Sequence, residues 1–397
     1  MKMVPYDVII LAGGLGTRLR GVVSDVPKCM APVAGKPFLE YLTDTLRGCS
    51  IGRVVFSIGY LGDIVRTWVD SRRWPFETAF AVEDEPLGTG GAVRFALGRC
   101  AARKVLLLNG DTIYNVDYDS LVEGSGDAPV HLSLKPMADT GRYGRVETDK
   151  DGRVASFREK LSGSHGLING GVCVLDREKL SFDGLARKFS FEKDVLEPLS
   201  AKGVLTASVS DSYFIDIGIA EDYGKAATEL PELSATRAMA AALETAAEGM
   251  ERPRTLILDR DGVINRRIPG DYVRAPEMFE FLPGIPEAVA RLSRVFDRIL
   301  VMSNQRGVGR GLMSMEDLGR IHEKMIHGLE AAGGRIDGIY CATSADPEAP
   351  DRKPRTGMFE KALADWPDMA PERTVMAGDS PSDMEFAAAC GIKAIKV

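Results

Sequence analysis

The chain has 397 residues, which is too long for one ordinary hydrophobic core, so two or three domains are expected. Hydrophobic residues make up 45% and charged residues 27%, as in globular proteins, and the net charge of -7 argues against a nucleic-acid-binding surface. No apolar run approaches the ~20 residues of a membrane helix, and no signal peptide precedes the first predicted strand. The six cysteines are scattered, which suits reduced thiols. These features favour a cytoplasmic enzyme without nucleic-acid or membrane partners.

The first half of the chain alternates between strand-like and helical stretches. Short apolar runs at 8–11, 54–58 and 105–108 predict parallel strands, and a helix is expected to start near Pro37. Such alternation predicts a doubly wound α/β sheet, in which ligands bind at the carboxyl ends of the strands. Asp111, which follows the third run, would lie at this edge.

A glycine-rich turn, Gly13-Gly14-Leu15-Gly16-Thr17-Arg18, follows the first predicted strand. Glycines let backbone N–H groups approach an anion, and Arg18 adds positive charge. The spacing is that of neither a P-loop nor a dinucleotide-binding fingerprint. Taken alone, the turn either cradles a phosphate or merely redirects the chain.

Other short motifs follow this turn in order: Pro27-Lys28, Gly88-Thr89-Gly90-Gly91, Asn109-Gly110-Asp111, Glu159-Lys160, Asn169-Gly170-Gly171 and Asp216. Each is weak alone, because Asp is common in turns and Asn-Gly in hairpins. Their order resembles the sugar-1-phosphate nucleotidyltransferases over residues 1–230. The run from Leu11 to Tyr41 resembles the heptose-1-phosphate guanylyltransferases within that family, although Cys29 stands where that group usually has proline.

The resemblance implies that a sugar phosphate attacks the α-phosphorus of GTP and expels pyrophosphate. Catalysis of this kind is mainly positioning and charge neutralisation, so Arg18 and Lys28 would be catalytic. The nucleotide would meet Leu11, Gly13, Gly14, Gly16, Thr17, Arg18, Lys28, Gly88, Thr89 and Asp111. The sugar phosphate would meet Glu159, Lys160 and Asn169, and the hard oxygens of Asp111 and Asp216 would bind Mg²⁺.

Residues 231–252 are expected to form a connector. Alanine and glutamate favour helix there, with Pro231 interrupting it. Glycine and serine are sparse, so a flexible linker is disfavoured.

The second half opens with a predicted strand at 255–258, followed by Asp259-Arg260-Asp261-Gly262. An Asp-x-Asp-Gly alone is more often a turn or a calcium-type loop than a catalytic pair. Here it is followed by a strand at 298–302 that ends in Ser303-Asn304-Gln305, then by Arg352-Lys353-Pro354 and Gly378-Asp379. This order resembles the haloacid-dehalogenase-like phosphatases over 253–397, and among them the heptose-1,7-bisphosphate 7-phosphatases.

This second resemblance assigns roles to the motif residues. Asp259 would be the nucleophile and Asp261 the general acid and base. Ser303 and Lys353 would hold the transferring phosphoryl group. The metal ligands would be Asp259, Asp261 and Asp379 around Mg²⁺, with Asp383 supporting them from behind, and the sugar and its distal phosphate would face Asn304, Arg306, Arg310 and Arg352.

Zinc is not expected. Relatives carry a Cys/His zinc loop just before the Arg-Lys-Pro motif, whereas residues 341–351 contain one cysteine, Cys341, and no histidine. A structural zinc needs about four nitrogen or sulfur ligands.

Together the motifs predict two doubly wound α/β domains, a nucleotidyltransferase with a Rossmann-like mixed sheet and a haloacid-dehalogenase-like Rossmannoid. They imply a bifunctional enzyme of GDP-heptose synthesis that acts on GTP and heptose phosphates. One alternative is a hexose-1-phosphate nucleotidyltransferase fused to a different small-molecule phosphatase. Another is a chain in which one domain is catalytically silent. The choice of guanine rests on resemblance alone, and formation of a homo-oligomer is open.

Overall fold

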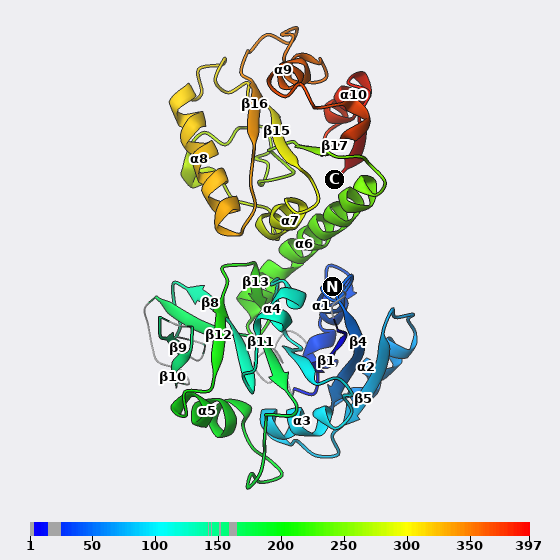
Figure 1. Ribbon diagram of the computed structural model, residues 1–397, viewed down its shortest axis with the longest axis vertical. Helices are drawn as coiled ribbons and strands as arrows, with labels where there is room; N and C mark the ends of the chain where they lie inside the picture. The colour runs from blue at the N-terminus through cyan, green and yellow to red at the C-terminus, as the bar shows by residue number, and fades with distance from the viewer. Residues whose placement is uncertain (1–3, 15–24, 142, 144, 151, 159–164) are drawn as a thin grey trace. The chain divides into compact units, whose positions relative to one another are not determined.

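The computed structural model describes residues 4–14, 25–141, 143, 145–150, 152–158 and 165–397 (Figure 1). The chain divides into two compact units, Met1–Leu230 and Pro231–Val397. Each unit has its own sheet. In the described part of the chain, we find no helix that is both long and apolar enough to cross a membrane.

The first unit is built on a nine-stranded mixed sheet. Its strands are β1 (Tyr6–Leu11), β4 (Ile51–Ile58), β5 (Glu77–Val82), β6 (Lys104–Asn109), β8 (Val130–Met137), β9 (Arg145–Thr148), β10 (Val154–Arg158), β11 (Gly166–Asp176) and β12 (Thr206–Val209). The four strands β5-β4-β1-β6 are parallel, and β11 pairs antiparallel with β6. Beyond β6, β11 also pairs antiparallel with β8 and β9. The three predicted strands lie within β1, β4 and β6, and the mixed sheet is confirmed.

Shorter elements complete this unit. The helices are α1 (Phe38–Asp44), α2 (Gly62–Asp70), α3 (Gly88–Leu97), α4 (Tyr118–Gly124) and α5 (Glu197–Ala201). Two small antiparallel sheets pair β2 (Pro32–Val33) with β3 (Lys36–Pro37) and β7 (Thr112–Tyr114) with β13 (Phe214–Asp216). Helix α1 begins directly after Pro37, as predicted. The core centres on the parallel strands, whose residues Ile9, Val55 and Leu107 are buried because both faces of the sheet are covered.

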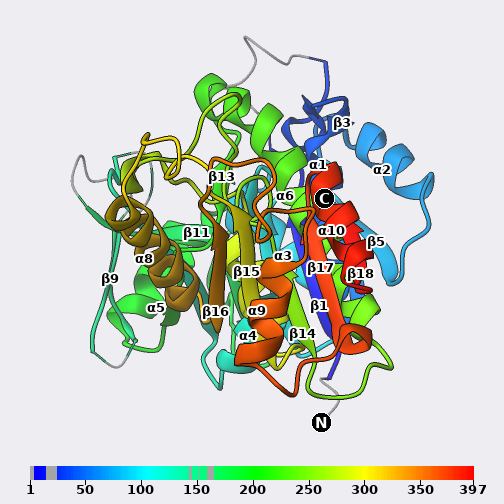
Figure 2. The same ribbon diagram turned by 90° about the horizontal axis from the view of Figure 1, so that it is seen from above.

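The second unit is built on a five-stranded, fully parallel sheet in the order β16-β15-β14-β17-β18 (Figure 2). The strands are β14 (Thr255–Leu258), β15 (Arg298–Asn304), β16 (Gly338–Ala342), β17 (Thr374–Gly378) and β18 (Lys393–Lys396), and the helices are α7 (Ile285–Leu292), α8 (Met315–Ala331), α9 (Gly357–Asp365) and α10 (Pro381–Ala389). The predicted strands at 255–258 and 298–302 are confirmed. A parallel sheet with helices between its strands is the predicted doubly wound architecture.

Alternate residues of the strands face two different cores. Ile257 of β14 packs in a cluster with residues of α9 and α10, whereas Leu256 and Leu258 belong to a cluster with residues of α7 and α8. Successive side chains of a strand point to opposite faces, so helices cover both faces of this sheet.

Helix α6 (Ala220–Ala247) includes residues of both units. The expectation that Pro231 interrupts the helix is wrong, because Pro231 lies inside it. Proline removes one helical hydrogen bond and costs about 3 kcal/mol in a helix interior. The helix continues because the side chains on either side, Leu230 and Leu233, are buried and offset that cost.

Part of the predicted connector belongs to the core of the second unit. Met239, Leu243 and Ala246 of α6 are buried in the same cluster as Leu256 and Val289. Residues 231–247 of this segment are therefore helical and cover one face of the sheet, and residues 248–252 lie beyond the helix.

Truncation of Leu243 tests this packing. Leu243 is fully buried, so Leu243→Ala should lower the free energy of unfolding of the second unit by about 2–5 kcal/mol. Urea unfolding followed by the fluorescence of Trp366, with Trp68 and Trp74 replaced by phenylalanine, measures this loss. The control is Thr245→Ala, since Thr245 is exposed on the same helix. Equal stability of the two variants would show that α6 does not support this core.

Candidate functional site

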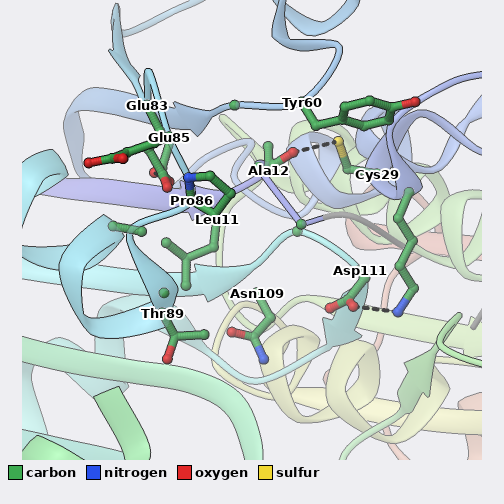
Figure 3. A pocket seen from close by; sticks show the side chains of 18 of the residues that line it. Leu11, Ala12, Cys29, Tyr60, Glu83, Glu85, Pro86, Thr89, Asn109 and Asp111 are labelled. Atoms are coloured by element: carbon green, nitrogen blue, oxygen red, sulfur yellow. Dashed lines mark hydrogen bonds and ion pairs between the residues drawn. The ribbon is translucent and has the colours of Figure 1, made fainter. Parts of the chain in front are cut away.

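In the first unit, Lys28 lies between two aspartates. Its Nζ forms an ion pair with Asp111 and lies 3.7 Å from Oδ1 of Asp216 (Figure 3 shows the pair with Asp111). Asp111 follows β6, and Asp216 ends β13, whose pairing with β7 places Asp216 opposite Thr112. The structure thus brings together three predicted site residues that are far apart in the sequence. Two carboxylates offer the hard oxygen atoms that suit Mg²⁺.

A cavity of 610 Å³ opens at the carboxyl ends of the parallel strands. The predicted nucleotide residues that line it are Leu11, Gly13, Gly14, Lys28, Gly88, Thr89 and Asp111. The cavity volume falls in the range typical of small-molecule sites. Gly16, Thr17 and Arg18, which were predicted to hold the triphosphate, lie outside the described residues.

The cavity also has polar lining residues outside the predicted nucleotide-binding set, among them Ser57, Tyr60, Glu83, Asn109 and Glu192. Glu83 follows β5 directly, as Asp111 follows β6. The rule that ligands bind at the carboxyl ends of parallel strands would have found Glu83, although no motif marks it.

Backbone and hydroxyl donors fix the carboxylate of Glu83 at the cavity wall (Figure 3). Ser57 Oγ donates to Oε1 at 3.3 Å, and the Leu87 N–H donates to Oε2 at 3.0 Å. A carboxylate can accept about four hydrogen bonds, so each oxygen of Glu83 can still accept one from a ligand.

The second glycine-rich turn is shaped by contacts within the protein. Gly88 has φ +74°, and a Cβ there would lie 2.6 Å from the carbonyl oxygen of Phe189. A Cβ at Gly90 would lie 2.3 Å from the Phe189 ring. Thr89 Oγ1 donates to Glu192 at 2.8 Å and accepts from the Phe191 N–H at 2.9 Å. These glycines therefore let the segment around Phe189 pack closely, while Gly88 and Thr89 also line the cavity.

Of the three residues of the first unit that were predicted to contact the sugar phosphate, the structure describes one. Glu159 and Lys160 lie outside the described residues. Asn169 lies in β11, where its Oδ1 accepts from the Gly171 N–H at 3.2 Å. It is not among the described residues that line the cavity.

In the second unit, Lys353 is buried between Asp259 and Asp383. Its Nζ lies 2.8 Å from Asp259 Oδ1 and 2.5 Å from Asp383 Oδ1, and it donates to the Met302 carbonyl at 2.8 Å. Burial raises the pKa of Asp259, and the positive charge of Lys353 opposes this shift. Lys353 therefore helps to keep the predicted nucleophile ionised.

Three carboxylates from the segments that follow β14 and β17 form a cluster. Oxygen atoms of Asp259, Asp379 and Asp383 all lie within 4.8 Å of one another. Gly262 has φ +96°, and a Cβ there would lie 2.2 Å from Asp379 Oδ2, so only glycine leaves room for this carboxylate. A cluster of carboxylate oxygens fits Mg²⁺.

Asp383 is held from behind the cluster. Its Oδ2 accepts from the N–H and the Oγ of Ser380, at 3.0 and 2.6 Å, and its Oδ1 faces Lys353. These contacts match a supporting position for Asp383, with Asp259 and Asp379 as the more available ligands.

Asp261 lies beside this cluster with its carboxylate fully engaged. Arg260 Nη2 donates to both oxygens at 2.9 and 2.8 Å, Asn265 donates to Oδ1 at 2.9 Å, and Gln305 donates to Oδ2 at 2.7 Å. Burial alone would raise the pKa of Asp261, but these donors bring it below its ordinary value. Its side chain does not belong to the three-carboxylate group that the described residues form.

The motif at the end of β15 supports Lys353. Ser303 is buried, and its Oγ accepts from Gln305 Nε2 at 2.9 Å. Asn304 exchanges two hydrogen bonds with the main chain of Lys353, at 3.0 and 3.2 Å. Asn304 was predicted to contact the sugar phosphate, and in the structure its amide holds the segment that carries Lys353.

The predicted arginines differ in how they are held. Among the described residues, buried guanidinium nitrogens of Arg306 (Nε) and of Arg352 (Nε and Nη1) have no hydrogen-bond partner, so they can donate to an anion. Arg310 is exposed, and its guanidinium lies 6.0 Å from the centroid of the Tyr272 ring. A further arginine, Arg267, was not predicted, and its Nη1 donates to Asp379 Oδ2 at 3.2 Å.

Comparison with known proteins identifies both halves. Residues 7–232 match the nucleotidyl transferase family, and residues 351–397 match the HAD-hydrolase-like family. The chain is 43% identical over 226 residues to D-glycero-α-D-manno-heptose 1-phosphate guanylyltransferase of Aneurinibacillus thermoaerophilus, which covers 56% of this chain and 98% of that protein. It is 44% identical over 133 residues to D-glycero-α-D-manno-heptose-1,7-bisphosphate 7-phosphatase of Mycobacterium tuberculosis, which covers 33% of this chain and 70% of that protein.

A solved structure is also similar to the first unit. HddC from Yersinia pseudotuberculosis, complexed with GMP-PN, is 41% identical and covers 56% of this chain and 98% of that chain, with a TM-score of 0.49. The chain therefore belongs to the nucleotidyl transferase family through its first unit and to the HAD-like phosphatases through its second.

Proposed function

We propose that the chain catalyses two steps in the synthesis of GDP-D-glycero-α-D-manno-heptose. Residues 253–397 remove the 7-phosphate of heptose 1,7-bisphosphate, and residues 1–230 then transfer GMP from GTP to heptose 1-phosphate. One observation carries this proposal: the two halves independently match enzymes that act on the same heptose, at 43% and 44% identity. A mannose-1-phosphate guanylyltransferase matches the first half at 31% identity, which makes the hexose alternative weaker.

The first reaction forms and then hydrolyses an aspartyl-phosphate. An oxygen of Asp259 attacks the 7-phosphorus, the bond from phosphorus to the sugar oxygen breaks, and that oxygen receives a proton from Asp261. Water then attacks the phosphorus of the aspartyl-phosphate, the bond from phosphorus to the Asp259 oxygen breaks, and orthophosphate leaves, while Asp261 takes the proton of that water.

Lys353 and the nearby arginines position the substrate. Lys353 forms an ion pair with Asp259, so the positive charge of Lys353 is also close to the phosphoryl group that is transferred. The unpartnered donors of Arg306 and Arg352 suit the distal phosphate. When bound by Asp259 and Asp379, Mg²⁺ would supply positive charge to the phosphoryl oxygens.

In the second reaction, a phosphate oxygen of heptose 1-phosphate attacks the α-phosphorus of GTP, and the bond to the bridging oxygen of pyrophosphate breaks. Lys28 neutralises negative charge on the triphosphate, together with Arg18. Asp111 and Asp216 would hold Mg²⁺, which supplies further charge neutralisation. GTP and sugar phosphates are metabolites of the cytoplasm, so the proposal places the chain there.

The two activities should be separable by single substitutions. Asp259→Asn should lower orthophosphate release from heptose 1,7-bisphosphate by on the order of 10³-fold or more, because the nucleophile is lost. It should leave pyrophosphate release from GTP and heptose 1-phosphate unchanged. Lys28→Met should lower pyrophosphate release and leave orthophosphate release unchanged, because Asp111 and Asp216 lose their counter-charge. Both products are measured with purified full-length protein and Mg²⁺.

Three outcomes would contradict this assignment. If the unmodified protein released neither product, the heptose proposal would fail, and a panel of hexose phosphates and nucleotides would test the alternative. If one substitution abolished both activities, the sites would not be separate. If only one activity were detectable with any substrate, one domain would be catalytically silent.

Glu83 is a candidate for reading the guanine base. Guanine presents two neighbouring N–H donors, N1–H and N2–H, and each oxygen of the Glu83 carboxylate can accept one more hydrogen bond. Glu83→Gln replaces one acceptor by a donor, so kcat/KM for GTP should fall by about 10- to 100-fold. The loss for UTP and ATP should be smaller, because these bases lack that pair of donors.

Glu85→Gln is the matched control, because Glu85 lines the same cavity but forms an exposed ion pair with Arg187 at 2.8 Å. Its nucleotide preference should match that of the unmodified protein. An equal loss for every nucleotide with Glu83→Gln would instead mean that Glu83 only supports the loop through Leu87.

A further inference from the structure

The segment that follows Asp261 has a firmly anchored beginning. Asn265 is fully buried and donates to Asp261. The next residue, Arg266, pairs with Glu232 of α6 at 2.5 Å and with Glu280 at 2.8 Å, and its N–H donates to the Glu280 carbonyl at 2.8 Å. Both the side chain and the main chain of Arg266 are therefore fixed.

Arg267 extends from this anchor toward the carboxylate cluster. Its side chain is 63% exposed, and its Nη1 reaches Asp379 Oδ2 at 3.2 Å. Asp379 is one of the three carboxylates of the cluster. The guanidinium thus lies at the place where the proposed reaction brings a phosphoryl group, while most of its surface faces solvent.

The chemistry of this position suits a phosphate ligand. A guanidinium can donate two parallel hydrogen bonds to phosphate oxygens, and such charge-assisted bonds are stronger than neutral ones. Within the part of the chain that the structure describes, its hydrogen-bond partner is a single carboxylate oxygen, so further N–H donors of Arg267 can contact a ligand. The same positive charge repels a divalent cation at Asp379.

We propose that Arg267 is a substrate-binding residue of the phosphatase site, where its guanidinium contacts a non-bridging oxygen of the phosphoryl group held at Asp259 and Asp379. Glu232 and Glu280 are positioning residues that act through Arg266. The inference rests on the proposed phosphatase function and adds a ligand contact to it. Arg267 would strengthen the binding of phosphate and weaken the binding of the metal ion.

Binding measurements separate these two effects. In full-length protein, Asp111→Asn and Asp216→Asn first remove the carboxylates of the other unit, so that calorimetric titration with Mg²⁺ reports the second unit. In this background Arg267→Gln should bind Mg²⁺ about two- to fivefold more tightly, because a nearby positive charge is lost. It should bind inorganic phosphate, titrated at saturating Mg²⁺, about tenfold more weakly. Arg267→Lys should recover part of the phosphate affinity.

The matched control is Arg320→Gln, because Arg320 is also an exposed arginine paired with an aspartate, Asp317, on α8. It should change neither affinity. If Arg267→Gln left phosphate affinity unchanged, or weakened both ligands alike, the proposal would be overturned in favour of a surface or purely structural role. Failure to hydrolyse heptose 1,7-bisphosphate would count against the proposed substrate only, since these titrations use Mg²⁺ and inorganic phosphate alone.

Discussion

In each unit, one lysine lies between two aspartates that come from distant parts of the sequence. Lys28 lies between Asp111 and Asp216, and Lys353 between Asp259 and Asp383. Carboxylates withdrawn from water are costly unless a positive charge or hydrogen bonds compensate them. The lysine is therefore what allows several carboxylates to gather at one edge of each sheet, and the rest of each site depends on it.

The two lysines differ in exposure, and this difference suits different chemistry. The side chain of Lys28 is 15% exposed beside an open cavity, whereas that of Lys353 is only 2% exposed. An open site can admit a large triphosphate with its base and sugar. A buried pair would hold the proposed nucleophile in a fixed position.

Much of this arrangement could be predicted from the sequence. The apolar runs predicted β1, β4, β6, β14 and β15, and the rule of carboxyl ends placed Asp111 at the edge where a ligand is expected. Neither Glu83 nor Arg267 could be found by motif, because each is a single charged residue whose position depends on contacts with distant residues. Pro231 was misjudged for a similar reason: the buried neighbours that keep α6 helical become visible only in the folded chain.

Glycines show a further limit of sequence reasoning. A glycine that admits a ligand and one that admits another part of the chain look alike in a sequence. Gly88 and Gly90 leave no room for a Cβ because of Phe189, and Gly262 leaves none because of Asp379. Whether a glycine makes room for a ligand or for another part of the chain depends on which atoms lie beside it. Only the structure shows those atoms.

Helix α6 limits how the two halves of the chain can be joined, because part of it is packed in the core of the second unit. The predicted phosphatase domain, 253–397, lacks Met239, Leu243 and Ala246, yet these residues are buried in the core of the second unit. Glu232 of the same helix also anchors Arg266, next to Arg267. A flexible linker in place of 231–247 would therefore remove part of a core and loosen a segment at the phosphatase site. The connector is constrained by the packing of the second unit, so its sequence is not free to vary as that of a simple tether would be.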